Sequence, residues 1–357
     1  PKKKSFEDII KDFEKIDGIY DFYWDENKNK CYLSIHPNQL DKIHLASFTR
    51  QGGDGYRYDG SSMLFEFPYS FKRIGTNIHL ISENVLFRAD KDSAIYKAIN
   101  KHISNSIFSV SKIEAISDTD SSILIDGSTL LFHDFMRIST RGKYLLDKKN
   151  SFFNEIKSFE HNAEIDFTLH YVGKKTNYVY TLPNSGSMLH KYHISLSEIL
   201  DNDYKPRLLD DRIGHFETMY QDYSNTLTHS PYVRYINRWN LKKKNPDNEL
   251  SEPITPIIFW LENTIPHEFR NAVRDGILGW NNAFEAIGFK NAIVVKQMQD
   301  DATWDPADIR YNTIRWMVHP GAGYAVGPSR ANPFTGELYD ADIRISADYV
   351  RFFFTEY

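Results

Sequence analysis

The amino-acid sequence predicts an α+β protein, in which a β-rich N-terminal domain precedes a mixed α/β domain with a twisted sheet and a crossover helix. Three observations lead to this prediction. Aromatic residues make up 15% of the 357 residues, and aromatic and β-branched side chains favour strands. Alternating apolar runs separated by turn residues fill much of residues 30–199. A strand, an amphipathic helix and a second strand follow one another closely after residue 256.

The chain begins with a segment that we expect to be a helix and a linker, residues 1–29. Apolar residues recur every three or four positions from Phe6 to Ile16, and this spacing predicts a helix over residues 5–16. Ser5 and Asp8 have the pattern of a capping box.

Residues 30–240 are expected to form the β-rich domain, a domain of unknown function. Predicted strands cover residues 31–35, 43–49, 63–67, 78–81, 85–88, 122–126, 165–172, 178–182 and 189–196. Isoleucines at every fourth position predict a helix at about residues 93–108, and a second, short helix is expected at about residues 152–159. We expect the strands to form an antiparallel sheet that is partly barrel-like or a sandwich.

A polar, turn-prone segment over residues 242–249 separates this domain from a second one, residues 253–357. Strands are expected at residues 257–261 and 292–296, with a helix at about 266–287 between them. Short links make this a crossover unit, so the two strands should be parallel. The apolar face of the helix consists of Phe269, Ala272, Val273, Ile277, Trp280, Phe284 and Ile287.

Gly288 is expected to end this helix in a left-handed conformation. Further strands are predicted at residues 309–316 and 340–345. The crossover prediction then requires Phe259, Val294 and Ile314 to lie in one sheet beneath the helix.

Composition excludes some functions. A net charge of −5 with interspersed signs argues against a nucleic-acid partner, which would require a basic face. No run of 18 apolar residues occurs, so no transmembrane segment is expected. The single cysteine, Cys31, lies in a strand pattern without an evident base, and we interpret it as a buried, inert thiol.

Several segments of the second domain carry a family resemblance. Residues 276–292 read GILGWNNAFEAIGFKNA, residues 308–316 read DIRYNTIRW, residues 327–329 read GPS, and residues 332–338 read NPFTGEL and lead into DADI. Residues 204–207 and 211–216, and the β-rich region before them, also fit. In these segments the chain resembles a family of secreted bacterial zinc-dependent metalloproteases, whose metzincin-like catalytic domain follows a β-rich domain of unknown function.

The resemblance implies a zinc-dependent endopeptidase that is secreted, periplasmic or on the cell surface. Such enzymes bind zinc through a helix that reads HExxH, in which both His reach one metal. The sequence contains no such motif. The nearest string begins at His267 and Glu268 but has Asn271 where the second ligand would stand, and we interpret it as a chance match.

In the family, the zinc helix follows the strand that residues 340–346 resemble. We therefore expect residues 1–357 to be the N-terminal part of the enzyme, inactive alone, with zinc held by residues beyond Tyr357. No catalytic or metal-binding residue is assigned within the sequence.

A candidate substrate site is the glycine-rich run of Gly323, Tyr324, Ala325, Val326 and Gly327. This run matches in order the edge strand that, in metzincin-like proteases, lines the cleft and pairs with a peptide or protein substrate. An open edge offers unpaired N–H and C=O groups to an added strand. The alternative interpretation is an ordinary glycine-rich turn.

Two other candidate sites are weaker. Asp300, Asp301, Asp305 and Asp308 could supply oxygens to calcium, but their spacing fits no calcium loop, so a solvated acidic loop is the preferred interpretation. His190 and His193 are three residues apart in a predicted strand, so they should point to opposite faces and share no metal.

A second hypothesis belongs to another functional class. The chain could be a non-catalytic secreted or surface module whose β-rich part binds a peptide or a glycan. The sequence leaves the substrate preference, the oligomeric state and the role of the β-rich domain open.

Overall fold

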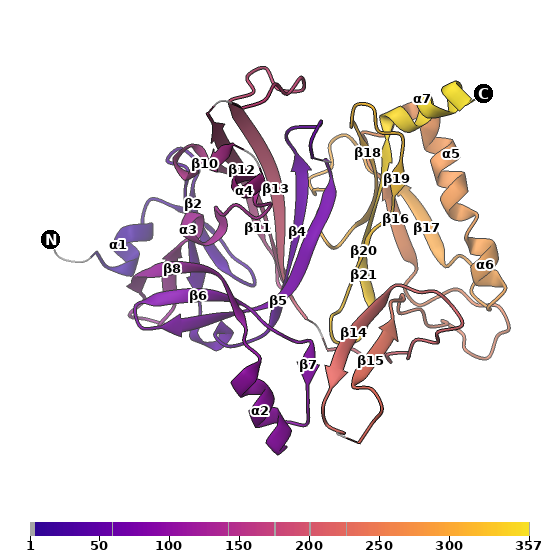
Figure 1. Ribbon diagram of the computed structural model, residues 1–357, viewed down its shortest axis with the longest axis horizontal. Coiled ribbons are helices and arrows are strands. Elements are labelled where there is room, and N and C mark those ends of the chain that lie inside the picture. The colour runs from indigo at the N-terminus through magenta and orange to yellow at the C-terminus, as the bar shows by residue number, and fades with distance from the viewer. Residues whose placement is uncertain are drawn as a thin grey trace. The chain divides into compact units, whose positions relative to one another are not determined.

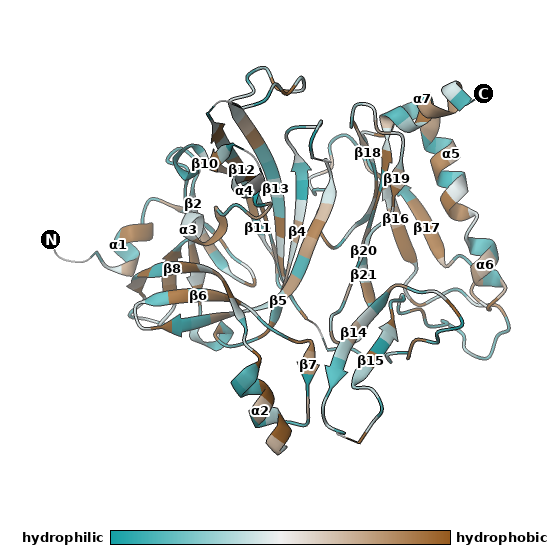
Figure 2. Cartoon of the chain, viewed as in Figure 1, coloured by the Kyte–Doolittle hydropathy of each residue, from teal (hydrophilic) through white to brown (hydrophobic). Residues whose placement is uncertain are grey.

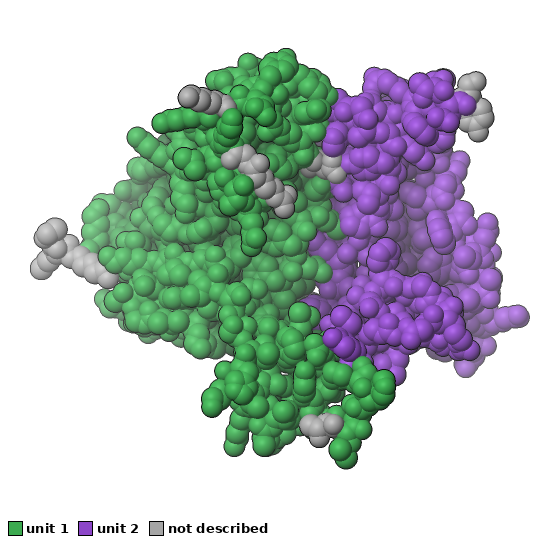
Figure 3. Space-filling model, viewed as in Figure 1, with its two compact units in different colours: residues 1–201, 220–231 green, residues 202–219, 232–357 purple. Residues whose placement is uncertain are grey.

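The structure is a computed structural model that describes residues 4–58, 60–141, 143–174, 176–199, 201–225 and 227–356. It is rich in strands (Figure 1). The chain divides into two compact units, coloured separately in Figure 3. Unit 1 contains residues 1–201 and 220–231, and unit 2 contains residues 202–219 and 232–357.

Unit 1 is built on a 12-stranded antiparallel sheet with the order β1-β2-β3-β9-β8-β6-β5-β4-β13-β12-β10, and β11 also pairs with β12. The strands are β1 (Glu14–Ile16), β2 (Asp21–Asp25), β3 (Lys30–Ile35), β4 (His44–Gly52), β5 (Ser62–Ile74), β6 (Asn77–Ser82), β8 (Ser106–Ile116), β9 (Ile123–Asp126), β10 (Tyr144–Leu146), β11 (Phe152–Ser158), β12 (Asn162–Gly173) and β13 (Ser187–Glu198).

Short helices connect these strands. They are α1 (Phe6–Ile10), α2 (Ala94–His102), α3 (Gly127–Leu131) and α4 (Ile138–Arg141), with 3₁₀ turns η1 (Pro37–Gln39) and η2 (Lys148–Asn150). The two-residue strand β7 (Phe87–Arg88) pairs in parallel with the end of β14 (Glu217–Asp222).

The sheet of unit 1 is nearly closed, in agreement with the expected antiparallel, partly barrel-like arrangement. At the closure, the Ile19 N–H donates to the Phe159 carbonyl at 2.5 Å, and the Ser158 hydroxyl donates to the Tyr20 carbonyl at 2.8 Å. A Cβ on Gly18 would lie 2.3 Å from Ser158 Oγ. The two backbones can therefore approach this closely only because residue 18 is glycine.

The closed sheet encloses a largely aromatic and aliphatic core. Alternate residues of each strand point inward, and Figure 2 shows this alternation as brown and teal bands along the strands. Phe167 of β12 is fully buried, and its ring lies 5.8 Å from Phe132, 5.9 Å from Phe135 and 5.7 Å from Tyr192. Cys31 is buried in the same cluster, and burial raises the pKa of its thiol, as expected for an inert cysteine.

Four local predictions in unit 1 were wrong. The N-terminal helix keeps its capping box but ends at Ile10, and strand β1 follows. Helix α2 ends at His102, because the isoleucine pattern continues into strand β8. Residues 152–159 are strand β11, not a helix, because a bulge after Phe153 puts Phe153 and Ile156 on one buried face and imitates helical spacing. Residues 178–182 form turns rather than a strand.

Unit 2 contains a six-stranded sheet with the order β17-β16-β18-β21-β19, and β20 also pairs with β21. The strands are β16 (Ile257–Leu261), β17 (Ile293–Gln297), β18 (Asn312–Met317), β19 (Ala325–Val326), β20 (Ser329–Ala331) and β21 (Leu338–Ser346). Helices α5 (His267–Leu278), α6 (Asn281–Glu285) and α7 (Ala347–Glu356), and strand β15 (Tyr232–Ile236), complete the unit.

The predicted crossover is present in this sheet. Strands β16 and β17 are parallel, with Phe259 opposite Val295 and Ile258 opposite Val294. Strand β18 pairs with the other side of β16, where Ile314 lies opposite Leu261. The three residues expected in one sheet are therefore in one sheet, with α5 and α6 along one of its faces (Figure 1).

The crossover helix itself is not continuous as predicted. It breaks at Gly279 between α5 and α6, and Gly288 adopts the predicted left-handed conformation with φ of 92°. Phe269, Val273, Ile277 and Phe284 pack against the sheet. Trp280 and Ile287, which were assigned to the same face, are exposed, because the break turns them away.

The aromatic core of unit 1 gives a first prediction. Substitution F167A should destabilise unit 1 by about 3–5 kcal/mol, because it leaves a cavity among packed rings. Y178A, which truncates a ring that is 81% exposed, should change stability by less than about 0.5 kcal/mol. Hydrogen exchange of the β12 amides measures both effects, and equal protection in the two variants would contradict this account of the core.

Candidate functional site

Strand β19 lies at the edge of the unit 2 sheet. It pairs in antiparallel fashion with β21, with Ala325 opposite Ile345 and Val326 opposite Arg344. Both residues of β19 are exposed. The structure thus contains an edge strand where the sequence predicted one, within the run from Gly323 to Gly327.

One residue of β19 directs its backbone N–H and C=O groups away from β21. The Ser346 N–H donates to the Tyr324 carbonyl at 3.0 Å, so Tyr324 faces β21. Alternation along an antiparallel strand then directs the N–H and C=O of Ala325 away from β21. These two groups have no partner among the residues that the structure describes, so the edge offers one free hydrogen-bonding rung.

The turn before β19 is held by the last residue of β21 and by the start of α7. The Ser346 hydroxyl donates to the Ala322 carbonyl at 2.5 Å, and the Gly321 N–H donates to the Asp348 carboxylate at 2.6 Å. The bond from Gly321 is the largest of the effects that lower the pKa of the Asp348 carboxyl. Asp348 therefore accepts this bond as a carboxylate at neutral pH.

Two glycines explain the composition of this segment. Gly321 has φ of 77°, a conformation that side chains other than glycine rarely adopt. A Cβ on Gly323 would lie 3.1 Å from Phe352 Cβ, so glycine allows α7 to pack closely on the segment. Gly323 therefore positions the strand, while Tyr324, Ala325 and Val326 form the edge.

A buried ionic cluster lies on β18 and β21, and the sequence analysis did not identify it. Arg315 Nη2 lies 3.5 Å from Glu262, and Nη1 lies 3.9 Å from Asp342. The Thr313 hydroxyl donates to Asp342 at 2.5 Å. Burial raises the pKa of Asp342, and Arg315 only partly opposes this effect. For Arg315, the nearby carboxylates outweigh burial and raise the pKa of the guanidinium.

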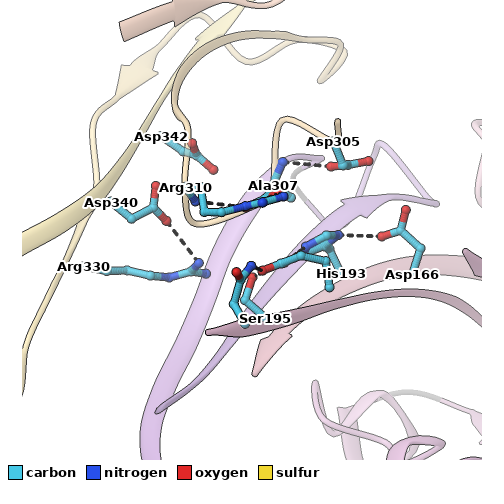
Figure 4. Close-up of polar contacts among 12 residues, drawn as sticks. Asp166, His193, Ser195, Asp305, Ala307, Arg310, Arg330, Asp340 and Asp342 are labelled. Atoms are coloured by element: carbon cyan, nitrogen blue, oxygen red, sulfur yellow. Dashed lines mark hydrogen bonds and ion pairs between the residues drawn. The ribbon is translucent and has the colours of Figure 1, made fainter. Parts of the chain in front are cut away.

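A neighbouring ion pair joins Arg330 of β20 to Asp340 of β21 at 3.2 Å (Figure 4). The signal in the sequence was the spacing of Asp340, Asp342 and Arg344, which puts three charges on one face of a strand. These contacts orient β21 and β20 against each other.

In unit 1, His193 of β13 lies between two carboxylates of β12. Its Nδ1 is 2.7 Å from Asp166 (Figure 4). Its Nε2 is 2.5 Å from Glu164, which also accepts a 2.5 Å bond from the Ser195 hydroxyl. Burial disfavours the imidazolium, but the two carboxylates outweigh burial and raise the pKa of His193 well above its usual value. The two carboxylates therefore favour the imidazolium form of His193, with a proton on each ring nitrogen.

His190 points to the other face of β13, as predicted, and is fully buried against the Tyr58 ring at 5.1 Å. Burial lowers its pKa to about 3. The two histidines therefore occupy separate environments, one neutral and one charged.

The four aspartates considered for calcium are engaged in other ways or exposed. Asp308 forms a bidentate pair with Arg310, and the Asp305 carboxylate accepts the Ala307 N–H at 2.8 Å. Asp300 and Asp301 are exposed in a turn. The string that begins at His267 opens the first turn of α5.

A profile described as a domain of unknown function, DUF5117, matches residues 62–244, just over half of the chain. The chain belongs to the DUF5117 family. Comparisons with curated proteins and with solved structures found no match. None of the helices in the described ranges is long and apolar enough to cross a membrane.

His193 gives a pH-dependent prediction for this DUF5117 protein. Because folding raises its pKa above 6.5, its charge contributes stability that is complete below pH 6.5 and is lost as the pH rises through the folded-state pKa. H193Q should therefore destabilise unit 1 by about 3 kcal/mol at mildly acidic pH and by less in alkaline solution.

Hydrogen exchange of the β13 amides at both pH values measures this difference. The matched control is H161Q, because His161 pairs with Glu198 at the surface, where such a pair contributes about 1 kcal/mol or less. A destabilisation by H193Q that grows with pH would show that His193 is not held as an imidazolium.

Proposed function

We propose that this chain supplies the substrate-holding edge of a zinc-dependent endopeptidase. The observation that supports this proposal is the outward-facing N–H and C=O of Ala325 on a strand fixed by β21 and α7. An extended peptide would add to β19 as a further antiparallel strand, with main-chain bonds that do not depend on its sequence. Such pairing holds a peptide straight and presents one bond for hydrolysis.

The zinc ion of such an enzyme activates water and polarises the scissile carbonyl. Residues 1–357 do not fit the usual zinc-binding pattern, because they contain no HExxH and His267 is followed by Asn271 at the second ligand position. The proposal therefore assigns no catalytic step to these residues. Their part is to bind and orient the peptide.

The edge is tested with a labelled peptide and its N-methylated counterpart. An extended peptide should shift the Ala325 amide resonance of residues 1–357 in a saturable way. The same peptide, N-methylated at every residue, should lose this effect, because neither of its edges can then donate to the outward carbonyl. Equal binding of the two peptides would contradict strand addition at β19.

A second measurement concerns the metal. Residues 1–357 alone should bind no stoichiometric zinc and should not cleave casein, because a stable site needs three or four well-placed ligands. Titration with zinc followed by metal analysis after gel filtration measures this. Tight binding of one zinc per chain would place the ligands within these residues and overturn the assignment.

A second candidate function is glycan binding by unit 1. Tyr56 and Tyr180 are about half exposed and lie 4.8 Å apart in a T-shaped pair, and Tyr178 is exposed nearby in sequence. The Asp54 carboxylate joins the two loops by accepting from the Thr181 hydroxyl at 2.6 Å and the Tyr56 N–H at 2.9 Å. Exposed tyrosine faces with polar neighbours suit the apolar faces of sugar rings.

The two candidates differ in the residues that they require. Loss of glycan-array binding in Y180A, with peptide binding at β19 unchanged, would support the glycan module. Binding of no glycan by the parent chain would remove that candidate.

A further inference from the structure

A cavity of about 570 Å³ opens in unit 2 beside β17, at the edge of the sheet opposite β19. Its wall includes the apolar side chains of Ile254, Leu278 and Val294, and its polar residues include Lys244 and Asn281. This volume is within the usual range for small-ligand sites, about 300–1,000 Å³. The backbone groups at the neighbouring edge of β17 indicate which kind of ligand the cavity can bind.

The backbone of β17 alternates between its partner strand and the cavity side. The Ile257 N–H donates to the Ala292 carbonyl at 2.8 Å, and the Met298 N–H donates to the Leu261 carbonyl at 2.9 Å. The even-numbered residues of β17 therefore direct their backbone N–H and C=O groups towards β16. Ile293 and Val295 direct theirs outward.

Asn281 already occupies the first outward position. Its amide accepts the Ile293 N–H at 2.9 Å and donates to the Ile293 carbonyl at 3.0 Å. This is the pair of hydrogen bonds that a neighbouring strand would make. The next outward residue, Val295, has no such partner in the described ranges of the chain.

This arrangement limits what can add to the edge. A strand that pairs with Val295 cannot continue past Ile293, because the Asn281 amide fills that position. The paired part of an added segment must therefore stop there, and a segment that ends there fits without having to bend away. If it runs antiparallel to β17, the end that lies at Ile293 is its C-terminus.

The charge beside this position suits a carboxylate. Lys244 is exposed on the cavity wall, and its ammonium group has no partner within the part of the chain that the structure describes. The opposite charge, Glu252, already accepts a hydrogen bond from Asn291 at 3.0 Å. Glu252 keeps its negative charge, and Lys244 is the one basic side chain among the described wall residues that can pair with a carboxylate.

We propose that this cavity binds the C-terminal residues of an extended peptide. The peptide backbone pairs with Val295, its terminal carboxylate pairs with Lys244, and its apolar side chains pack against Ile254 and Leu278. The mode combines strand addition with capture of a C-terminal carboxylate. It uses a different edge from β19 and does not depend on the proposed peptidase activity.

The test uses acetyl-Ala-Val-Ala-Val with a free carboxylate and the same peptide as its C-terminal amide. With residues 1–357, the free acid should shift the Val295 amide resonance in a saturable way. The amide should bind about tenfold more weakly, because a charge-assisted bond is lost. Binding at β19 has no such preference and would be observed at Ala325.

The variant K244M should weaken binding of the free acid about tenfold and should leave binding of the amide unchanged. K205M is the matched control, because Lys205 is exposed in the same unit and does not line the cavity. Equal affinity for acid and amide, an unchanged affinity in K244M, or no saturable shift at Val295 would each overturn the proposal.

Discussion

The free edge of unit 2 depends on one requirement, that the backbone of β21 be hydrogen-bonded on both sides. Strand β18 meets this requirement in parallel on one side, and β19 and β20 meet it in antiparallel fashion on the other. The chain must therefore turn back twice within a short span. The turn between β20 and β21 is made by Asn332 and Gly336, where Gly336 has φ of 77° and donates to the Asn332 carbonyl at 2.8 Å.

The sequence predicted the parts of unit 2 that are local. A strand, a helix and a strand joined by short links have few possible arrangements, and the right-handed crossover leaves the strands parallel. The position of Gly288 followed from the same reasoning, because a left-handed residue ends a helix at lowest cost when it is glycine. The break at Gly279 was not predicted, since helical spacing does not reveal that Asn281 must reach the Ile293 backbone.

The order of the strands in unit 1 could not be predicted in the same way. Strand β4 pairs with β13, and β3 pairs with β9, across long stretches of sequence. Such pairings depend on register, which the alternation of single strands does not specify. The His193 cluster shows the consequence, because Asp166 lies opposite His193 and Glu164 lies opposite Ser195 only after β12 and β13 are aligned.

The two edges of the unit 2 sheet are both restricted in the length of backbone that they leave unpaired. Open edges invite uncontrolled pairing with other chains, and proteins limit this by shortening or covering them. Strand β19 has two residues, so it offers one outward rung at Ala325. Strand β17 is longer, and Asn281 covers the rung at Ile293. What remains open at each edge is therefore a short stretch of backbone, and this restriction limits uncontrolled pairing with other chains.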